Sequence, residues 1–352
     1  MISLNSKIVH NFTTDENFVL KVEKNSQSIN SCLENSNKFE TSYGSFQFIN
    51  NIELEEGEIL IIFPKYNFIE RFFRPNANAN TILLTENCDQ KCIMCSQPPK
   101  NKDYLYFDLY EKACVLLPMN TFIGISGGEP TLFKKELFQM INKVIEKRPD
   151  IKFHILSNGQ HFEKSDMDDL KATNDNILWA VPLYSSSEVI HDLIVSKKGA
   201  YKKLYSNLDY LCLSGSNLEI RTVFMKTNAE DLENIALKIH KNFSWLQVWA
   251  IMQLEKIGYA KMNWKSIFYD SSFNFDPIAK ALTISKIYNI NAKLYNFPIC
   301  TVPAQFRSLA VKSISDWKQK YLDDCKNCLV KNDCCGFFEW YDDSYKNVRA
   351  IN

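Results

Sequence analysis

The stretch TILLTENCDQKCIMCSQ, residues 81–97, decides how the rest of the chain is organised. It begins with a short β-branched and aliphatic run, which is typical of a buried strand. It continues into a loop that carries Cys88, Cys92 and Cys95. A parallel strand presents such a loop at its carboxyl end, where α/β folds bind ligands. Three thiolates are one ligand short of a structural zinc site, whereas an iron–sulfur cluster held by three cysteines would keep one iron open to a small molecule.

The spacing C-x3-C-x2-C behind a first strand, with Met94 just before the last cysteine, resembles the signature of the radical SAM superfamily. The alternative is that three cysteines happen to be close on a reactive or zinc-binding loop. The resemblance implies a [4Fe-4S] cluster whose open iron binds S-adenosylmethionine, with Met94 among the cofactor-binding residues. Reductive cleavage of S-adenosylmethionine would yield a 5′-deoxyadenosyl radical that abstracts hydrogen from the substrate.

Length and composition narrow the class of protein. The 352 residues suit one large α/β domain with appendages, and the formal net charge of zero argues against a mainly electrostatic nucleic-acid binder. The N-terminal residues lack the features of a signal peptide, and the longest aliphatic run, Ile59–Phe63, is far below the ~20 residues that span a bilayer. We therefore expect a soluble cytoplasmic protein without membrane contact. Its 11 cysteines are then more typical of metal ligands than of disulfides.

The pattern of elements predicts three domains. Residues 1–78 indicate a small β-rich accessory domain, with β runs at 7–10, 18–22, 45–49 and 59–63. Strands are then predicted at 81–85, 121–125, 151–156, 177–183, 218–224 and 246–252. Helices are predicted at 103–117, 132–147, 163–173, 198–213 and 229–241. Such alternation indicates an α/β fold with a parallel sheet, and residues 79–255 match the partial (β/α)6 barrel that the resemblance implies. Residues 256–352 form a C-terminal, cysteine-rich extension.

The second predicted strand leads into the sequence SGGEPT, which contains Gly127, Gly128, Glu129 and Pro130. Two glycines allow the backbone to approach a ligand closely, and Glu129 adds a carboxylate. Read alone, the sequence is a turn. Behind a three-cysteine loop it resembles the GGE motif of radical SAM proteins, in which backbone and carboxylate hold the amino group of S-adenosylmethionine.

Three later strand ends also carry polar residues. Ser157 and Asn158 follow the third strand, either as an ordinary turn or, as the resemblance implies, as contacts to ribose or adenine. Ser185 follows the fourth strand and either contacts the ribose or caps the helix that starts at Ser186. Arg221 lies within the fifth strand, where it either pairs with Glu219 or faces the carboxylate of S-adenosylmethionine.

Several other polar and sulfur-bearing residues are predicted to be structural. Asn228 is expected to cap the next helix, and a lone histidine such as His191 is more often structural than catalytic. Cys114 and Cys212 lie in apolar helical stretches, where a free cysteine behaves as a small hydrophobe. Cys32 is assigned to the same group.

A second set of cysteines lies near the C-terminus. Cys300, Cys325, Cys328 and Cys334 supply four thiolates, which suit zinc or an iron–sulfur cluster. Because the first loop already indicates iron–sulfur chemistry, we favour a second [4Fe-4S] cluster over zinc. Cys335 is left out of the ligand set, because glycine is common at that position in the C-terminal sequence of the radical SAM proteins that this region resembles.

The phrases CIMCSQPP, ISGGEPTL, HILSNGQ, VPLYSSS, LYNFPIC and CGFFEW occur in this order and resemble the radical SAM maturases of His-Xaa-Ser peptide systems. That resemblance implies a ribosomally made precursor peptide as substrate and an electron donor such as a flavodoxin or ferredoxin. Two other functions stay open. One is a radical SAM enzyme that acts on nucleic acid or a nucleobase-like small molecule. The other is a non-catalytic metalloprotein whose N-terminal β domain captures a peptide strand at a sheet edge.

Overall fold

A computed structural model of the chain describes residues 5–23, 31–35, 38–50 and 52–352, with residues 5 and 31–35 described by their backbone alone. The side chain of Cys32 and parts of the predicted domain 1–78 therefore lie outside the described residues. The chain divides into two compact units. One comprises Met1–Ile82, Tyr104–Ile125 and Phe133–Phe153, and the other comprises Leu83–Asp103, Ser126–Leu132 and His154–Asn352.

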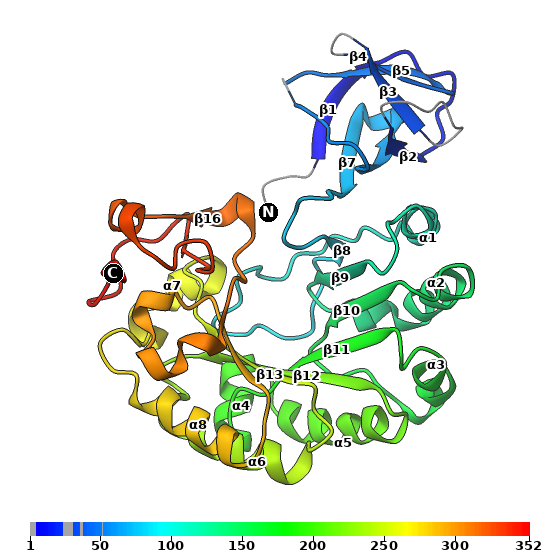
Figure 1. Cartoon of the computed structure of the whole chain (residues 1–352). Helices are drawn as coiled ribbons and strands as arrows, with labels where there is room; N and C mark the ends of the chain where they lie inside the picture. Colours follow the sequence, from blue (N-terminus) through cyan, green and yellow to red (C-terminus); the bar gives the residue numbers. More distant parts are fainter. Residues whose placement is uncertain (1–4, 24–30, 36–37, 51) are drawn as a thin grey trace. The chain divides into compact units, whose positions relative to one another are not determined.

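Strands of the first unit form a closed barrel in the order β1-β5-β4-β3-β2-β6-β7 (Figure 1, blue). They are β1 (Asn5–His10), β2 (Phe18–Val22), β3 (Ser31–Asn35), β4 (Lys38–Thr41), β5 (Gly44–Phe48), β6 (Ile59–Phe63) and β7 (Phe68–Phe73). Alternating apolar residues such as Leu20, Phe46, Leu60 and Ile62 fill the core. The prediction of a small β-rich N-terminal region is confirmed.

The closure of the barrel bears on one of the alternative functions. β1 pairs antiparallel with both β5 and β7. Among the described strands of the barrel, none is therefore left as an outer strand with an unpaired edge. A peptide adds to a sheet by pairing with such an edge. The interpretation of this domain as an edge that captures a peptide strand thus loses its structural basis.

An eight-stranded sheet follows in the order β15-β14-β13-β12-β11-β10-β9-β8. Its strands are β8 (Thr81–Thr85), β9 (Phe122–Gly127), β10 (Lys152–Leu156), β11 (Ile177–Pro182), β12 (Asn217–Phe224), β13 (Val248–Gln253), β14 (Ala292–Tyr295) and β15 (Ala310–Val311). The pairs from β11 to β15 are parallel, which confirms the predicted α/β fold. The six predicted strands correspond to β8–β13. β14 and β15 were not predicted, because elements this short show no periodic pattern.

The helices are α1 (Phe107–Val115), α2 (Lys134–Lys147), α3 (Met167–Ala172), α4 (Glu188–Val195), α5 (Ala200–Leu213), α6 (Leu232–Asn242), α7 (Gly258–Ile267) and α8 (Asp276–Ile287). The five predicted helices correspond to α1, α2, α3, α5 and α6. Figure 1 shows α4, α5, α6 and α8 along one face of strands β11–β13. None of the helices that the structure describes is both long and apolar enough to cross a membrane.

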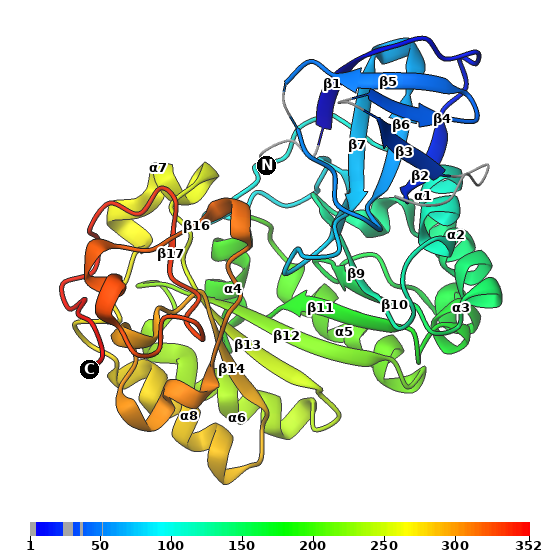
Figure 2. The same cartoon turned by 45° about the horizontal axis from the view of Figure 1, so that its top comes forward.

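The C-terminal segment consists mainly of short turns. They are η5 (Ile299–Thr301), η6 (Ala304–Leu309), η7 (Asp316–Lys318) and η8 (Asp323–Asn327), with the antiparallel pair β16 (Gln319–Lys320) and β17 (Phe337–Phe338). Ile314, Cys335 and Phe338 form a small core with Trp340 packed against it. Both views show this segment beside α7 (Figures 1 and 2), where the rings of Phe268 and Tyr345 lie 5.8 Å apart.

Two structural predictions need correction. Cys114 is fully buried in α1 as expected, but Cys212 is exposed, because it lies on the outer side of α5 while Leu208 and Leu211 face the core. Asn228 occupies the N-cap position of the short turn η4 (Ala229–Asp231), which leads into α6, but its side chain forms no capping hydrogen bond there. Its amide group donates to the carbonyl oxygens of Tyr184 and Val223, and its side-chain oxygen accepts the amide of Met225.

Candidate functional site

The three cysteines that follow β8 line one cleft in the second unit, with a volume of about 260 Å³. The other predicted site residues on its wall are Met94, Gly127, Gly128, Ser157, Asn158 and Arg221. Among the described residues that line the cleft, the cysteines are the only side chains of the His, Cys, Asp and Glu types. The wall therefore offers three soft ligands and polar groups beside them, as a three-thiolate cluster with a small molecule on its open iron requires.

The cysteine loop is held on two sides. The amide of Ile93 donates to the carbonyl oxygen of Ile194 at the end of α4, at 2.9 Å. On the other side, the amide of Tyr259 at the start of α7 donates to the carbonyl oxygen of Cys95, at 2.8 Å. Gly258 has φ +58, and a Cβ there would lie 2.5 Å from the same oxygen. The sequence did not reveal this support, because Gly258 lies far along the chain and outside any recognised motif.

Burial shapes the chemistry of the three thiols. It raises the pKa of Cys88 to about 12 and raises the pKa of Cys92 and Cys95 as well. A buried thiolate is therefore stable only beside a positive charge. A metal centre supplies that charge, because it replaces the proton when the thiolate binds it. The donor set and the charge it requires thus fit the iron–sulfur cluster that was predicted from the spacing.

The two glycines of the SGGEPT turn are required by the backbone that precedes the cysteines. Gly127 has φ +142, and a Cβ there would lie 2.0 Å from the carbonyl oxygen of Thr85. A Cβ on Gly128 would lie 2.0 Å from the carbonyl oxygen of Asn87. The amides of Gly128 and Glu129 donate to these same two oxygens, each at 2.7 Å. The two glycines therefore allow this turn to pack closely against the backbone at the start of the cysteine loop.

Glu129 is completely buried and does not line the cleft. One carboxylate oxygen accepts the Thr131 amide at 2.9 Å, the Thr131 hydroxyl at 2.5 Å and the Ser157 hydroxyl at 2.8 Å, while the other accepts the Asn158 amide at 2.5 Å. Burial raises its pKa, and these hydrogen bonds oppose that effect. Glu129 thus joins the turn after β9 to the end of β10, and Pro130 beside it is buried in the same turn.

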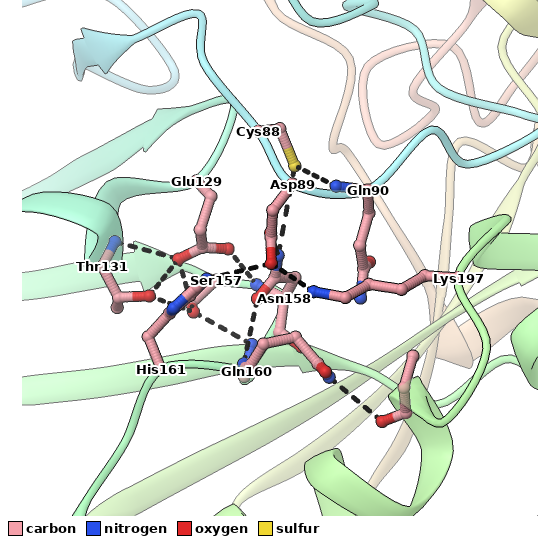
Figure 3. Close-up of polar contacts among 12 residues, drawn as sticks. Cys88, Asp89, Gln90, Glu129, Thr131, Ser157, Asn158, Gln160, His161 and Lys197 are labelled. Carbon is pink, nitrogen blue, oxygen red and sulfur yellow. Dashed lines mark hydrogen bonds and ion pairs between the residues drawn. The ribbon is translucent and has the colours of Figure 1, made fainter.

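Asn158 connects this turn to the cysteine loop (Figure 3). Its side-chain amide nitrogen Nδ2 donates to Asp89 at 2.6 Å and lies 4.0 Å from the sulfur of Cys88, while its backbone amide donates to Glu129. Asp89 also contacts the ring nitrogen Nε2 of His161, at 3.3 Å, and forms an ion pair with Lys197. Burial alone would raise the pKa of Asp89, but hydrogen bonds from His161 and Lys197 hold it well below its usual value. Sequence analysis missed Asp89, His161 and Lys197, although Asp89 directly follows a predicted ligand.

Arg221 pairs with Glu219, which is one of its two predicted arrangements, and it also lies at the wall of the cleft. It lines the cleft, and one guanidinium nitrogen lies 2.7 Å from Glu219 while another lies 3.1 Å from the sulfur of Met252. Glu219 also contacts His154 at 3.0 Å. Burial would raise the pKa of Glu219, but the hydrogen bond from His154 and the charge of Arg221 lower it. The ion pair therefore fixes the guanidinium at the wall of the cleft.

Ser185 and His191 lie behind the wall of the cleft. The hydroxyl of Ser185 donates to Asp231 at 2.5 Å and accepts the amide of Ser187, the residue just before α4, at 3.0 Å, so it closes the turn that precedes this helix and does not cap the helix itself. His191 accepts the amide of Tyr184 at 3.3 Å and stacks on the Tyr184 ring. Burial lowers the pKa of His191 to about 4, so it is neutral near pH 7. The structural interpretation of His191 is confirmed.

The four C-terminal cysteines Cys300, Cys325, Cys328 and Cys334 line a second, small cavity. The sulfur of Cys334 accepts the amides of Ile299 and Gly336, each at 3.3 Å. A hydrogen bond from the Cys335 thiol and these two amides lower the pKa of Cys334 to about 6, against the effect of burial. Cys335 is buried, does not line the cavity and has its pKa raised by the same hydrogen bond. Cys334 is therefore the member of this pair that is arranged as a metal ligand.

Comparison with known proteins agrees with the site. Residues 82–239 match the Radical SAM superfamily, so the chain contains a radical SAM superfamily domain. One similar solved structure is Streptococcus suis SuiB bound to S-adenosylmethionine, with 17% sequence identity, a TM-score of 0.50, and coverage of 61% of this chain and 49% of SuiB. This chain thus spans about half the length of SuiB.

Two further structures are similar over larger shares of their own chains. A radical SAM methyltransferase from Sphaerobacter thermophilus has 13% identity and a TM-score of 0.46 over 73% of this chain and 71% of its own. The protein anSMEcpe with bound AdoMet and Cp18Cys peptide has 15% identity and a TM-score of 0.45 over 60% of this chain and 62% of its own. The sequence matches none of the curated proteins with which it was compared. At such identities the likeness to SuiB concerns the fold alone.

Proposed function

We propose that this radical SAM enzyme modifies a ribosomally made peptide, as a maturase of the His-Xaa-Ser type. The observation that carries the chemistry is the single cleft in which Cys88, Cys92 and Cys95 meet the glycine turn and Arg221. When bound, a [4Fe-4S] cluster with S-adenosylmethionine would supply reductive cleavage and hydrogen abstraction from the substrate. SuiB, whose fold is similar, has been observed with S-adenosylmethionine bound.

Different residues of the cleft would bind different parts of the cluster and of S-adenosylmethionine. Cys88, Cys92 and Cys95 would hold the cluster. The backbone of Gly127 and Gly128 would take the amino group of S-adenosylmethionine, and the guanidinium of Arg221 would take its carboxylate, for which a planar donor pair is suited. Ser157 and Asn158 would contact the ribose or adenine.

The remaining residues of the site would hold the cleft in shape. Met94 is 7% exposed and would contribute an apolar surface that excludes water. Glu129, Pro130 and Ser185 would act behind the wall, since Glu129 and Ser185 direct their hydrogen bonds to neighbouring loops. Such supporting groups matter because a binding site requires its contact residues to be fixed in place.

We further propose that Cys300, Cys325, Cys328 and Cys334 hold a second [4Fe-4S] cluster, with zinc as the alternative. Four thiolates that line one cavity are the type of donor that both metals accept. Among the residues that the structure describes, no group of three or more His, Cys, Asp or Glu side chains is spaced to bind a single metal ion. Measurement of the iron and zinc bound to the purified protein distinguishes the two metals.

The peptide substrate rests on the ordered phrases that resemble the maturases and on the C-terminal cysteine set. The same proposal includes an electron donor such as a flavodoxin or ferredoxin, a cytoplasmic location and no role for a membrane or nucleic acid. It also includes the division into an accessory domain (1–78), a partial (β/α)6 barrel (79–255) and an extension (256–352). In this view β14 and β15 extend the sheet beyond the six strands of the barrel.

Two measurements test the proposal. Electron paramagnetic resonance of the reduced, anoxically purified protein is expected to change when S-adenosylmethionine is added, because the cofactor would bind the open iron. An unchanged spectrum at full iron loading would contradict that role. Mass spectrometry of a co-expressed His-Xaa-Ser precursor peptide is expected to show a mass change that depends on Cys88. An unmodified peptide, together with normal cleavage of S-adenosylmethionine, would refute the peptide substrate alone.

A further inference from the structure

An exposed apolar pair lies on α4, close to the cysteine loop. Val189 is 76% exposed and Leu193 is 57% exposed. They are four residues apart on one helix, so their side chains lie on the same face. Two exposed aliphatic residues side by side give this face of α4 a small apolar centre.

Exposed lysines lie on the two chain segments that adjoin α4. Lys91, Lys198 and Lys203 are exposed, and none of them forms an ion pair with any residue that the structure describes. Lys202 is also exposed and pairs with Glu188 on the first turn of α4, at 3.2 Å. We call Val189, Leu193, Lys91, Lys198 and Lys203 the α4 surface. Its uncompensated charge is positive, although the chain as a whole has a formal net charge of zero.

Backbone hydrogen bonds place this surface against the metal site. The amide of Lys91 donates to the carbonyl oxygen of Val195 at 3.3 Å, and the amide of Ile93 donates to that of Ile194 at 2.9 Å. Lys91 itself lies between Cys88 and Cys92 in the sequence, and its Cα is about 3.8 Å from that of Cys92 across one trans peptide. A partner seated on the α4 surface would therefore lie beside two of the three proposed ligands.

We propose that the α4 surface docks the electron donor, a small one-electron carrier protein with an acidic face. The inference rests on the proposed function, in which the metal site at Cys88, Cys92 and Cys95 must be reduced. One electron leaves the carrier, which is oxidised, and enters this metal site, which is reduced. Electron-transfer complexes have small, transient interfaces, and complementary charge increases their rate of association. A small apolar centre bordered by lysines suits such an encounter.

The charge of the surface can be reversed without touching a proposed ligand. The test variant is Lys91→Glu, Lys198→Glu and Lys203→Glu. The matched control is Lys241→Glu, Lys280→Glu and Lys286→Glu, which changes the same net charge at exposed positions of α6 and α8. Fluorescence anisotropy measures the binding of labelled flavodoxin and of labelled ferredoxin at low and at high salt. Dithionite, which needs no docking, serves as the alternative reductant for cleavage of S-adenosylmethionine.

We expect the test variant to bind the preferred carrier at least about tenfold more weakly at low salt, and the control to bind like the wild type. Dithionite-driven cleavage and iron content are expected to be equal in all three proteins. Binding of the test variant within twofold of the wild type would overturn the docking surface, as would wild-type protein that binds neither carrier. Wild-type protein that is loaded with iron but inactive with dithionite would instead overturn the proposed function.

Discussion

Glu129→Ala removes the one carboxylate that joins the turn after β9 to the end of β10. Glu129 is completely buried and accepts four hydrogen bonds, from the amides of Thr131 and Asn158 and from two hydroxyl groups. The hydroxyls can rotate toward other acceptors, but the two amides are fixed by the backbone. A buried N–H group without an acceptor costs about 1–3 kcal/mol, so we expect the free energy of unfolding to fall by about 2–6 kcal/mol.

Two further variants grade this effect. Glu129→Gln keeps the volume and one oxygen but turns an NH2 group toward one of the two amides, so it is expected to cost about 1–3 kcal/mol. Ser157→Ala removes the hydroxyl that donates to Glu129 and accepts the buried amide of Gly159 at 3.0 Å, so it is expected to cost about 1–3 kcal/mol. Urea unfolding followed by circular dichroism measures all three against the wild type. Glu129→Ala is predicted to be the least stable of the three variants, because it leaves two buried amides without an acceptor.

The same variants separate positioning from ligation. Because Ser157 and Asn158 line the cleft, Glu129→Ala is expected to weaken the binding of S-adenosylmethionine, measured by equilibrium dialysis, while the iron content stays at the wild-type level. Loss of iron would mean that Glu129 supports the cysteine loop rather than the part of the cleft wall formed by Ser157 and Asn158. An Ala variant that unfolds at the wild-type urea concentration and binds S-adenosylmethionine equally well would refute the reasoning altogether.

Three other predictions follow from the geometry. Replacing all three cysteines of the first loop by Ala is expected to leave about four irons per chain, held by the C-terminal set; residual zinc without iron would favour the zinc site. Gly128→Ala is expected to lower the iron content, because its Cβ would lie 2.0 Å from the Asn87 carbonyl oxygen. Gly199→Ala strains the backbone at φ +80, but its Cβ meets nothing within 4 Å, so this control is expected to keep the iron. Burial lowers the pKa of His191 from 6.5 to about 4, so its contribution to stability is fully present above pH 6.5 and decreases as the pH falls toward 4. His191→Gln should remove about 2 kcal/mol of the loss between pH 7.5 and 5 seen by urea unfolding, and an unchanged pH dependence would contradict this.

The sequence was most informative where the pattern is local. β-branched runs between helical stretches marked β8–β13 correctly, and the spacing of the three cysteines was sufficient to predict one shared cleft. The choice of Cys334 over Cys335 agrees with the cavity, which Cys334 lines and Cys335 does not. Each of these features depends on neighbouring residues, whose arrangement follows from backbone periodicity and short loops.

Features that depend on distant residues could not be predicted. The ion pair between Asp89 and Lys197 joins residues that are far apart in the sequence, and no motif marks Lys197 as the partner of a residue in the cysteine loop. The hydrogen bond from the start of α7 to Cys95 could not be predicted either, since it depends on how a later helix packs. The carboxylate of Glu129 was expected to contact the cofactor, but it is buried and accepts hydrogen bonds from Ser157 and Asn158. Tertiary packing decides such contacts, and local sequence does not record them.

The most direct test of the central claim is the formation of 5′-deoxyadenosine by the reduced protein. Anoxically purified wild-type protein, given dithionite and S-adenosylmethionine, is expected to form 5′-deoxyadenosine, which chromatography quantifies. The variant that lacks Cys88, Cys92 and Cys95 is expected to form none, even though iron remains at the C-terminal cysteines. Formation of 5′-deoxyadenosine by that variant at the wild-type rate, or none by iron-loaded wild-type protein, would contradict the assignment of this cleft.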